Sequence, residues 1–521
     1  MRLTELISAL PPLSLPPGKD PEISGVESDS RRIRPGNVFV ACTGGKADGR
    51  TFLPQAIAAG AAAVVGETEP ASCPVPFVRV ADARAALGWM AAAWFGFPSR
   101  RMVLIGVTGT DGKTTTVNLV YGILKKAGLR AGMISTISAV IDGEELDTGF
   151  HVTTPDAKAL QEYLARMAAA GLTHCVLEVT SHGLAQRRVE GCEFDAAAVT
   201  NITREHLDYH GTFEAYRAVK AGLFAGLGSA PAKVFFPARK AVLNADDPSY
   251  EYLRSQVSVP VVTYGVRRKA DFSGEDVRAE ADGIRLTVRT PDGKFPVESA
   301  LTGVYNVENI LAAMAVAVAA LGVDPQTAAK AVGSIAGVPG RWEKIDLGQE
   351  FLAIVDFAHT PKALRSVLEA ARAIKGSRGR VIAVFGSAGL RDREKRRILA
   401  AIGIELADIS VLTAEDPRTE SLPLILEEMA EGARSRGGVE GKTFYRIPDR
   451  GAALRFAVQT ARKEDIVIAC GKGHEQSMCF GEVEYPWDDR RALRAALAGV
   501  MGIPGPAMPA LPTSVDVKEE I

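Results

Sequence analysis

The stretch IGVTGTDGKTTT, Ile105–Thr116, joins an apolar run to a glycine-rich turn. The usual P-loop pattern, G-x-x-x-x-G-K-[ST], would place a glycine at position 107, but this chain has Val107 and carries its glycines at 106, 109 and 112. The residues before the turn predict a buried strand, and KTTTVNLVYGILKKAG after it predicts a helix. This order presents backbone N–H groups and the positive end of a helix dipole to an anion. It predicts a phosphate-binding loop, with an ordinary strand-to-helix turn as the competing interpretation.

Side chains in the loop, and others that follow two further apolar strands, indicate that the phosphate is part of a nucleotide bound with Mg²⁺. Lys113 would reach the β- and γ-phosphates of a nucleotide, and the Thr114 hydroxyl would bind Mg²⁺. Glu178 ends the strand in LEVTSHGL, and His206 follows the strand before TNITREHLDYHG. Ligands of open α/β sheets bind beyond the carboxyl ends of the strands, so these residues should face one crevice. A histidine is an unusual Mg²⁺ ligand and needs an anionic neighbour. By itself, Lys220 would be interpreted as a solvated helical lysine.

Strand and helix patterns alternate along the chain, which is typical of α/β folds. GFPSRR (96–101) and the Gly/Pro-rich AGVPGRWEKI (336–345) suggest domain boundaries. We therefore expect a small N-terminal α/β domain (1–100), a central P-loop ATPase-like domain with a mostly parallel sheet (101–337) and a C-terminal Rossmann-like α/β domain (338–500). The Pro-rich, polar residues 501–521 are expected to form a disordered tail.

Composition excludes several classes of protein. The chain has 521 residues, too many for a single hydrophobic core. Its 61 basic and 62 acidic residues nearly balance and do not indicate a basic surface for nucleic acid. Six cysteines without C-x-x-C spacing argue against a zinc site or a disulfide framework. The N-terminus lacks the pattern of a signal peptide, and the longest apolar run, 310–323, is too short to span a bilayer. A cytoplasmic protein is expected.

Seven motifs, three of them quoted above, occur in an order that resembles the Mur ligase family, and within it the MurE-type UDP-N-acetylmuramoyl-tripeptide synthetases. They are GVTGTDGKTTT, LEVTSHGLAQRRV, TNITREHLDYHG, GVYNVEN, GRWEKI, VDFAHTP and GKGHE. The resemblance covers nearly the whole chain, including DSRRIRPGNVFVACTGGKADG near its start.

The resemblance implies an ATP- and Mg²⁺-dependent ligase, a monomer that works in peptidoglycan precursor synthesis. Its three domains would bind the UDP end of the substrate, ATP and an amino acid. The γ-phosphate of ATP would activate the side-chain carboxylate of D-glutamate in UDP-N-acetylmuramoyl-L-alanyl-D-glutamate as an acyl phosphate. The amine of a diamino acid would then attack it, and phosphate would leave. Because a carboxylate is a poor electrophile, phosphorylation is needed to provide a leaving group.

The resemblance also implies the site residues. The ATP site would comprise Gly109, Thr110, Asp111, Gly112, Lys113, Thr114, Thr115, Asn306, Asn309, Arg341, Asp356 and His359. The UDP-substrate site would comprise Ser28, Ser30, Gly45, Lys46, Ala47, Thr153, Thr154, Thr180, Gln186 and Arg188. The amino-acid pocket would comprise Arg391, Glu415, Asp416, Arg418, Gly471 and Glu475. The metal ligands would be Thr114, Glu178, His206 and Lys220 as its carbamate, N6-carboxylysine, which supplies the anion that His206 needs. The catalytic residues would be Lys113, Glu178, His206, Lys220 and Arg341.

The chain departs from the family pattern at several positions. Asp111 replaces an asparagine, Thr180 a serine, and Leu390 the acidic residue before Arg391. The diaminopimelate-adding enzymes typically read D-N-P-R where this chain reads EDPR (415–418). Asp416 adds a negative charge that could disfavour a distal carboxylate, pair with Arg418 or bind a distal amine. For the added amino acid, meso-diaminopimelate is slightly favoured, with L-lysine and L-ornithine as the alternatives.

Two other functions compete with this interpretation. One is a different ligase of the superfamily, similar to folylpolyglutamate synthase, against which the uridine-type N-terminal motif argues. The other is a regulatory P-loop protein that binds or hydrolyses nucleotide without joining substrates. A ligase is distinguished from it by low ATP turnover until acceptor and amino acid are both present.

Overall fold

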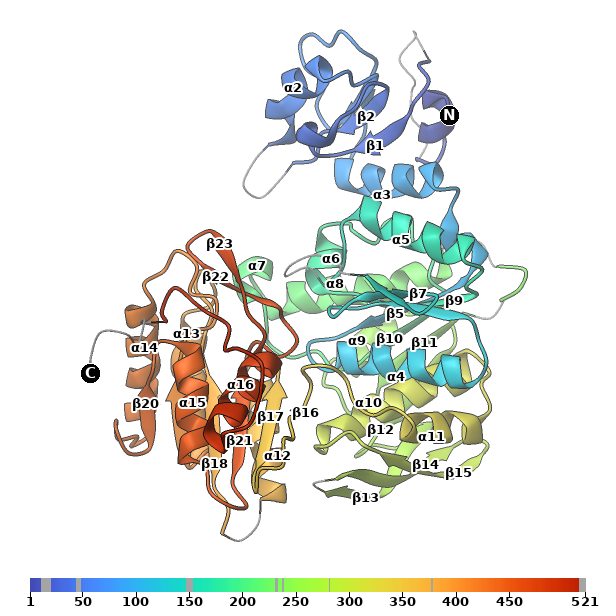
Figure 1. The fold of residues 1–521 in the computed structure, drawn as a ribbon. Helices are drawn as coiled ribbons and strands as arrows, with labels where there is room; N and C mark the ends of the chain where they lie inside the picture. Colours follow the sequence, from blue (N-terminus) through green and yellow to red (C-terminus); the bar gives the residue numbers. More distant parts are fainter. Residues whose placement is uncertain are drawn as a thin grey trace. The chain divides into compact units, whose positions relative to one another are not determined.

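The structure is a computed structural model that describes residues 1–10, 20–43, 48–146, 153–229, 233–236, 239–280, 282–375 and 378–514 (Figure 1). The chain groups into two compact units. The first comprises residues 1–202, 214–264 and 312–328, and the second comprises 203–213, 265–311 and 329–521. The glycine-rich turn lies in the first unit and the GKGHE motif in the second. The first unit joins the predicted N-terminal domain to most of the central one, so the three-domain division stays a prediction.

The N-terminal part of the first unit is a parallel sheet of four strands in the order β1-β2-β3-β4. The strands are β1 Gly25–Glu27, β2 Asn37–Val40, β3 Ala63–Gly66 and β4 Phe77–Arg79. The helices are α1 Leu3–Ile7, α2 Leu53–Ala58 and α3 Ala83–Trp94, and the 3₁₀ turns are η1 Ser30–Arg32, η2 Gly49–Phe52 and η3 Pro98–Arg101. Both β2 and β3 are buried along their whole length, as expected for apolar strands of a parallel sheet.

A larger sheet forms the rest of the first unit, with strands in the order β12-β11-β10-β5-β9-β6-β7-β8. Its strands are β5 Val103–Thr108, β6 Ala131–Ile134, β7 Ala139–Ile141, β8 Glu144–Leu146, β9 His174–Glu178, β10 Ala196–Val199, β11 Lys240–Asn244 and β12 Val261–Gly265. All neighbours from β12 to β6 are parallel, while β7 and β8 are antiparallel. The predicted mostly parallel sheet is confirmed, and the carboxyl ends of β10, β5 and β9 lie next to one another.

Helices and turns of this part connect successive strands. They are α4 Lys113–Lys126, α5 Ala157–Ala169, α6 Ser181–Ala185, α8 Phe213–Ala225, η4 Gly226–Gly228 and α9 Tyr250–Ser255. The chain then passes through α10 Tyr305–Met314, the π-helical turn η5 Ala315–Ala320 and α11 Pro325–Gly333. The apolar run 310–323 thus forms a buried helical segment, as predicted, and among the described residues no helix is long and apolar enough to cross a bilayer.

The second unit contains an antiparallel meander, a short helix and a six-stranded sheet. The meander is β13 Phe272–Glu280, β14 Gly283–Thr290 and β15 Gly293–Ser299, and the helix is α7 Leu207–His210. The sheet has the order β16-β17-β21-β18-β19-β20 and is parallel except for β16. Its strands are β16 Glu343–Lys344, β17 Leu352–Asp356, β18 Val381–Phe385, β19 Ile409–Leu412, β20 Phe444–Arg446 and β21 Ile466–Cys470.

Five helices and a hairpin complete the second unit. They are α12 Pro361–Ile374, α13 Glu394–Leu406, α14 Leu422–Arg434, α15 Arg450–Thr460, α16 Asp489–Met501 and the hairpin β22 Ser477–Phe480 and β23 Val483–Pro486. Side-chain caps begin several of the helices, for example Thr360 at α12 and Asp449 at α15. The α/β pattern predicted for the C-terminal region is confirmed.

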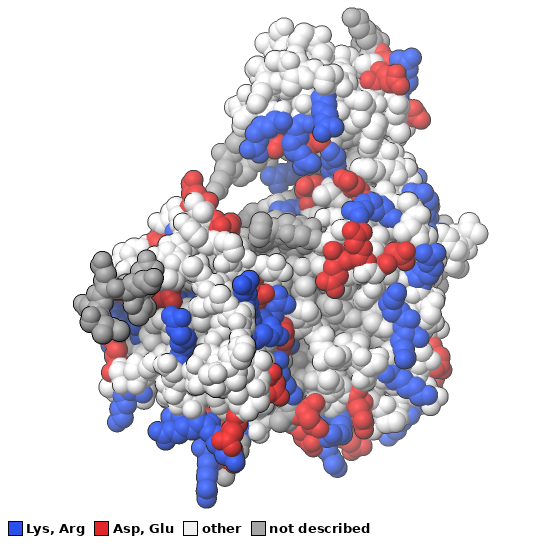
Figure 2. Space-filling view, viewed as in Figure 1, with Lys and Arg blue, Asp and Glu red and all other residues white. Residues whose placement is uncertain are grey.

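Four alternating charges form a closed ring beside α14 and β20, which we call the charge ring: Glu427, Arg434, Glu440 and Arg446. Arg434 contacts the two glutamates at 2.7 and 2.8 Å. Arg446 contacts Glu440 at 2.6 Å and also pairs with Glu427. Each side chain is partly exposed. On the face drawn in Figure 2, basic and acidic side chains are interspersed.

The expectation of a disordered tail is wrong for residues 502–514. Leu511 is buried in the core of the second unit. The hydroxyls of Thr513 and Ser514 donate to Asp449 Oδ2 at 3.0 and 2.9 Å, respectively. One apolar anchor and two hydrogen bonds to a helix cap therefore order a segment whose Pro-rich composition predicted disorder. Residues 515–521 lie outside the described part.

Candidate active site

The glycine-rich turn of the first unit has a backbone that only glycine tolerates. Gly109 and Gly112 have φ angles of +146° and +83°. A Cβ atom on Gly109 would lie 1.9 Å from Thr200 Oγ1, so the close approach of β10 excludes any side chain there. Gly112 directly precedes α4, and the N-terminus of a helix favours an anion through its N–H groups and its dipole. The turn has the form of a phosphate-binding loop.

Hydrogen bonds from the end of β10 hold this loop. Thr110 N donates to Asn201 O at 2.7 Å, and Asp111 O accepts from Thr200 Oγ1 at 2.6 Å. Lys113 Nζ donates to Thr110 O at 2.9 Å. Asp111 Oδ2 is buried and has no hydrogen-bond partner among the described residues, which leaves a carboxylate oxygen for a group that the structure does not contain.

Thr114 and Glu178 provide oxygen ligands of the kind that Mg²⁺ prefers. Thr114 Oγ1 donates to Glu178 Oε2 at 3.0 Å, and Thr136 N donates to the same oxygen at 3.0 Å. Glu178 is only 1% exposed. Among the described residues no group of three or more His, Cys, Asp or Glu side chains could hold a metal ion. A site of one hydroxyl and one carboxylate fits Mg²⁺, which keeps several waters and binds substrate phosphates.

Lys220 on α8 is buried directly beneath the loop. It is 1% exposed, and its Nζ donates to Gly109 O at 2.7 Å. Burial lowers the pKa of Lys220 well below its usual range, and the positive charge of Lys113 adds to this effect. Nearby acidic groups oppose it only in part. The interpretation of Lys220 as a solvated lysine is therefore wrong, because the amine is buried against the loop and its charged form is disfavoured there.

A chain of hydrogen bonds connects the end of β9 to the residues predicted to hold the muramoyl peptide. Thr154 Oγ1 donates to Glu178 O and contacts Thr180 Oγ1, each at 3.1 Å. Thr180 caps α6, which explains why threonine can replace serine at this position. Arg188 donates to Thr154 O at 2.8 Å and to Gln186 Oε1. Thr153 Oγ1 accepts from Thr136 Oγ1 at 3.1 Å.

The predicted uridine-diphosphate residues are only partly described. Ser30 begins η1 and donates to Gln55 Oε1 at 2.9 Å, while Ser28 is exposed just after β1. Gly45, Lys46 and Ala47 lie outside the described residues.

The second unit carries the other residues predicted for ATP. Asn309 Nδ2 donates to Asn306 Oδ1 at 2.8 Å at the start of α10. The Arg341 guanidinium lies 4.3 Å from the centroid of the Phe357 ring. His206 adopts a left-handed φ of +57° before α7. His206 belongs to this unit, whereas Thr114, Glu178 and Lys220 belong to the other, so its participation in one metal site with them stays a prediction.

Asp356 and His359 follow β17. The two carboxylate oxygens of Asp356 accept from the backbone of Trp342 and Ala358, at 2.7 and 2.8 Å. Burial raises the pKa of Asp356, although Arg341 and these N–H groups oppose the shift. Asp356 thus joins the 338–342 turn to β17, and its predicted contact with ribose remains a prediction.

Three loops at the carboxyl ends of β18, β19 and β21 bring together most of the predicted amino-acid pocket. Glu415 is 6% exposed, and burial raises its pKa to about 7. A Cβ atom on Gly471, whose φ is +110°, would lie 2.2 Å from Glu415 Oε2, so glycine is required here. Arg418 NH1 donates to Gly389 O at 3.3 Å.

Asp416 is engaged in a buried ion pair that sequence reasoning missed. Lys472 Nζ lies 2.8 Å from Asp416 Oδ1 and 2.6 Å from Glu475 Oε2. The N–H of Cys479 also donates to Asp416 Oδ1, at 2.9 Å. Burial opposes the charge of Lys472, but its two carboxylate neighbours outweigh burial and raise its pKa. The partner of Asp416 is thus Lys472, a possibility absent from the three sequence-based options, although the lysine stands in the GKGHE motif.

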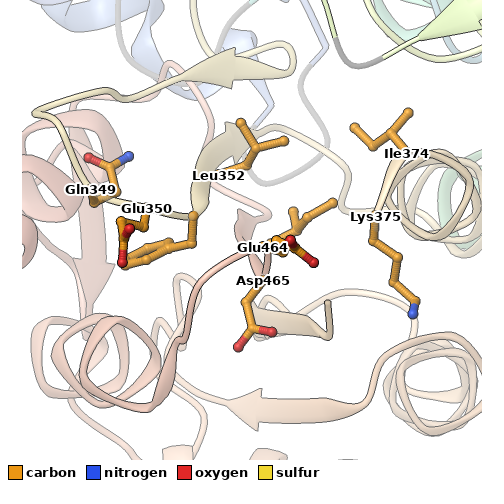
Figure 3. A pocket seen from close by; sticks show the side chains of 9 residues that line it. Gln349, Glu350, Leu352, Ile374, Lys375, Glu464 and Asp465 are labelled. Atoms are coloured by element: carbon orange, nitrogen blue, oxygen red, sulfur yellow. The ribbon is translucent and has the colours of Figure 1, made fainter. Parts of the chain in front are cut away.

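A separate hollow of the second unit lies away from this pocket. It has a volume of about 410 Å³ and is lined by residues at the amino ends of β17 and β21, among them Leu352, Asp465 and Ile466 (Figure 3). None of the predicted site residues lines it. Ligands of parallel sheets bind at the carboxyl ends of strands, so this hollow lies at the wrong edge for the predicted chemistry.

Comparisons with known proteins agree with this geometry. Three family models match the chain: "Mur ligase family, catalytic domain" at residues 22–95, "Mur ligase middle domain" at 107–317 and "Mur ligase, glutamate ligase domain" at 340–473. A UDP-N-acetylmuramyl-tripeptide synthetase of Roseiflexus sp. (strain RS-1) is 45% identical over 508 residues, which cover 96% of this chain and 99% of that protein.

The chain belongs to the Mur ligase family. Within this family it is similar to the UDP-N-acetylmuramoyl-L-alanyl-D-glutamate--2,6-diaminopimelate ligase of Geobacillus thermodenitrificans, with 39% identity over 95% of this chain and 99% of that one. A solved structure of a ligase of the same name has a TM-score of 0.67 and 32% identity, covering 96% of this chain and 100% of the other. The predicted MurE-type branch and the α/β fold class are confirmed.

Proposed function

We propose that this Mur ligase joins a diamino acid to UDP-N-acetylmuramoyl-L-alanyl-D-glutamate in an ATP-dependent reaction of cytoplasmic peptidoglycan precursor synthesis. Full-length relatives at 39–45% identity that carry this activity in their names support the proposal. The observation that carries it is the grouping of a phosphate loop and a buried carboxylate at adjoining strand ends of the first unit, with a buried lysine of α8 against the loop.

The first step is transfer of the γ-phosphate to the D-glutamate side-chain carboxylate. A carboxylate oxygen attacks the γ-phosphorus, the bond to the β,γ-bridging oxygen breaks, and ADP leaves. Residues 109–115 would hold the phosphates, chiefly through the N–H groups at the start of α4, because those of Thr110 and Asp111 donate to Asn201. Lys113 would release Thr110 O to reach the phosphates. Thr114 and Glu178 would hold Mg²⁺, which when bound neutralises phosphate charge. Arg341 would contact the γ-phosphate.

In the second step the amine of the diamino acid attacks the acyl carbon, and phosphate leaves after a tetrahedral intermediate. The chain's contribution is to orient the two reactants and to exclude water from the acyl phosphate. Thr153, Thr154, Thr180, Gln186 and Arg188 would hold the muramoyl peptide. Asn306, Asn309, Asp356 and His359 would bind the nucleoside of ATP.

Lys220 is proposed to act as its carbamate. Only a neutral amine adds to CO₂, and the lowered pKa of Lys220 favours that form. The product is an anion beside the loop. With His206 it would bind a second Mg²⁺, besides the one held by Thr114 and Glu178. Burial would also disfavour the charged carbamate, but the positive charges of Lys113 and of bound Mg²⁺ would compensate for this cost.

For the diamino acid we propose meso-diaminopimelate. Asp416 pairs directly with Lys472, so the negative charge that replaces asparagine is partly compensated where it lies, and the cations Arg391 and Arg418 can attract a distal carboxylate. L-Lysine and L-ornithine, which lack this carboxylate, are the alternatives. We propose a monomer that binds neither nucleic acid nor membrane.

The test is phosphate release with ATP, Mg²⁺ and UDP-N-acetylmuramoyl-L-alanyl-D-glutamate, run separately with meso-diaminopimelate, L-lysine and L-ornithine, with product masses measured. Turnover only with diaminopimelate supports the proposal in full. Turnover with lysine or ornithine instead would keep the ligase and reject the proposed amino acid. ATP hydrolysis that needs neither acceptor nor amino acid would favour a regulatory nucleotide-binding protein, and turnover with a folate acceptor would favour the folylpolyglutamate-type ligase.

A further inference from the structure

Two loops of the proposed amino-acid pocket are joined by side chains that the family resemblance does not assign. Loop 386–393 follows β18 and carries Arg391, and loop 413–421 follows β19 and carries Arg418. Since β18 and β19 are parallel neighbours, both loops leave the same edge of the sheet. The relative placement of the two arginines depends on how these loops are fixed to each other.

Backbone contacts between the loops are close. Gly389 N donates to Asp416 O at 3.0 Å, and Gly389 O accepts from Arg418 NH1. A Cβ atom on Gly389 would lie 2.0 Å from Pro417 O, so the loops touch where only glycine fits.

Three non-glycine residues of the two loops have strained backbones. Leu390, Asp416 and Arg418 have φ angles of +55°, +39° and +53°. L-residues seldom adopt this left-handed region, and such conformations persist only when surrounding contacts enforce them. Contacts with neighbouring side chains must therefore hold this pair of loops in place.

Glu420 and Arg396 provide that constraint. Glu420 Oε1 accepts from Leu390 N, and its Oε2 lies 2.8 Å from Arg396 NH2. Arg396 on α13 is 1% exposed and pairs through NH1 with Glu428 on α14, also at 2.8 Å. One carboxylate oxygen of Glu420 is thus held by the buried Arg396. The other binds the N–H of Leu390, the residue directly before Arg391.

We propose that Glu420, anchored by Arg396, is a positioning residue that sets the spacing of Arg391 and Arg418 and thereby the recognition of a distal carboxylate. This inference rests on the proposed function of the pocket. Glu420 itself need not touch the diamino acid, because it acts on the two loops that carry the arginines. Its role also explains how Leu390 can replace an acidic residue, since the pocket uses the N–H of Leu390.

The experiment compares Glu420→Ala with Glu428→Ala in the full chain. Glu428→Ala is the control, because it removes the other carboxylate partner of Arg396, and with it the pair between Glu428 and Arg393, but keeps the bond from Leu390 N to Glu420. For Glu420→Ala we expect the KM for meso-diaminopimelate to rise by about 10- to 100-fold, the KM for ATP to stay within about twofold, and the preference for diaminopimelate over lysine to fall at least about tenfold. Glu428→Ala should keep that preference.

A second variant covers the event that Glu420→Ala does not fold. Glu420→Gln keeps an acceptor for Leu390 N but loses the charge that pairs with Arg396, so it should show an intermediate rise in KM. Equal loss of preference in the Glu420 and Glu428 variants, or unchanged preference in both Glu420 variants, overturns the inference while leaving the ligase intact. A wild-type chain that ligates none of the diamino acids overturns the proposed function and this inference together.

Discussion

Lys220 in the first unit and Lys472 in the second are both almost fully buried, at 1% and 0% exposure, but their surroundings differ. Lys220 donates to a backbone carbonyl, whereas Lys472 lies between the carboxylates of Asp416 and Glu475. Burial without a paired carboxylate lowers the pKa of Lys220, and two paired carboxylates raise that of Lys472. The comparison teaches that burial alone does not decide the charge of a lysine. The amine of Lys220 is suited to react as a nucleophile, whereas the ammonium of Lys472 is suited to compensate the charge of neighbouring carboxylates.

Replacing Lys472 should have the largest effect. Lys472→Met leaves two buried carboxylates without their cation, and we expect the free energy of unfolding to fall by about 3–5 kcal/mol. Urea denaturation measures it. The control is Lys472→Met combined with Asp416→Asn, which should recover part of the loss. An unchanged midpoint in the single variant would show that Lys472 is not a charged partner.

Replacing Lys220 should affect activity and not stability. Lys220→Met removes the proposed carbamate, and we expect kcat to fall by about 10²- to 10³-fold. The free energy of unfolding should stay the same or rise, because a buried amine with one polar contact is lost. Phosphate release and urea denaturation measure both. Short-chain carboxylates should partly restore a Lys220→Ala variant, and full activity in that variant would contradict the carbamate.

Glu415 extends the comparison to a buried acid. Its pKa of about 7 exceeds the ordinary value of 4.5, so the folded chain binds this proton more tightly than the unfolded chain. As pH rises from 4.5 to 7, Glu415 should therefore reduce the free energy of unfolding, by about 3 kcal/mol in total. Denaturation midpoints of wild type and Glu415→Gln should converge below pH 4.5, separate as pH rises from 4.5 to 7, and stay apart above pH 7. Parallel pH profiles would show that Glu415 titrates normally.

The smallest effect is expected for Asp416→Asn, which restores the asparagine of the family pattern. Lys472 keeps Glu475 as a partner, and the amide oxygen can still accept from Cys479 N. We expect a loss of about 1–2 kcal/mol in stability and less than about a tenfold change in the KM for the diamino acid. A complete switch between diaminopimelate and lysine would show that Asp416 selects the substrate directly.

Local patterns predicted the strands, the phosphate loop and the order of the elements, because glycine turns, apolar runs and helix caps act over a few residues. The Asp416–Lys472 pair joins positions 56 residues apart, and the bond from Glu420 to Leu390 spans 30. No sequence pattern encodes such contacts. The ordered segment 502–514 was missed for a related reason, since its anchors depend on Asp449 and the core of the second unit.

The charge ring beside α14 and β20 has a consequence for behaviour on heating. The cost of removing water from ions falls as temperature rises, so a closed network of four charges contributes more when the protein is hot than at 25 °C. The ring ties α14 to β20, and α14 begins directly after the loop that carries Arg418. The helix that follows the Arg418 loop is therefore held to β20 by contacts whose contribution to stability does not fade on heating.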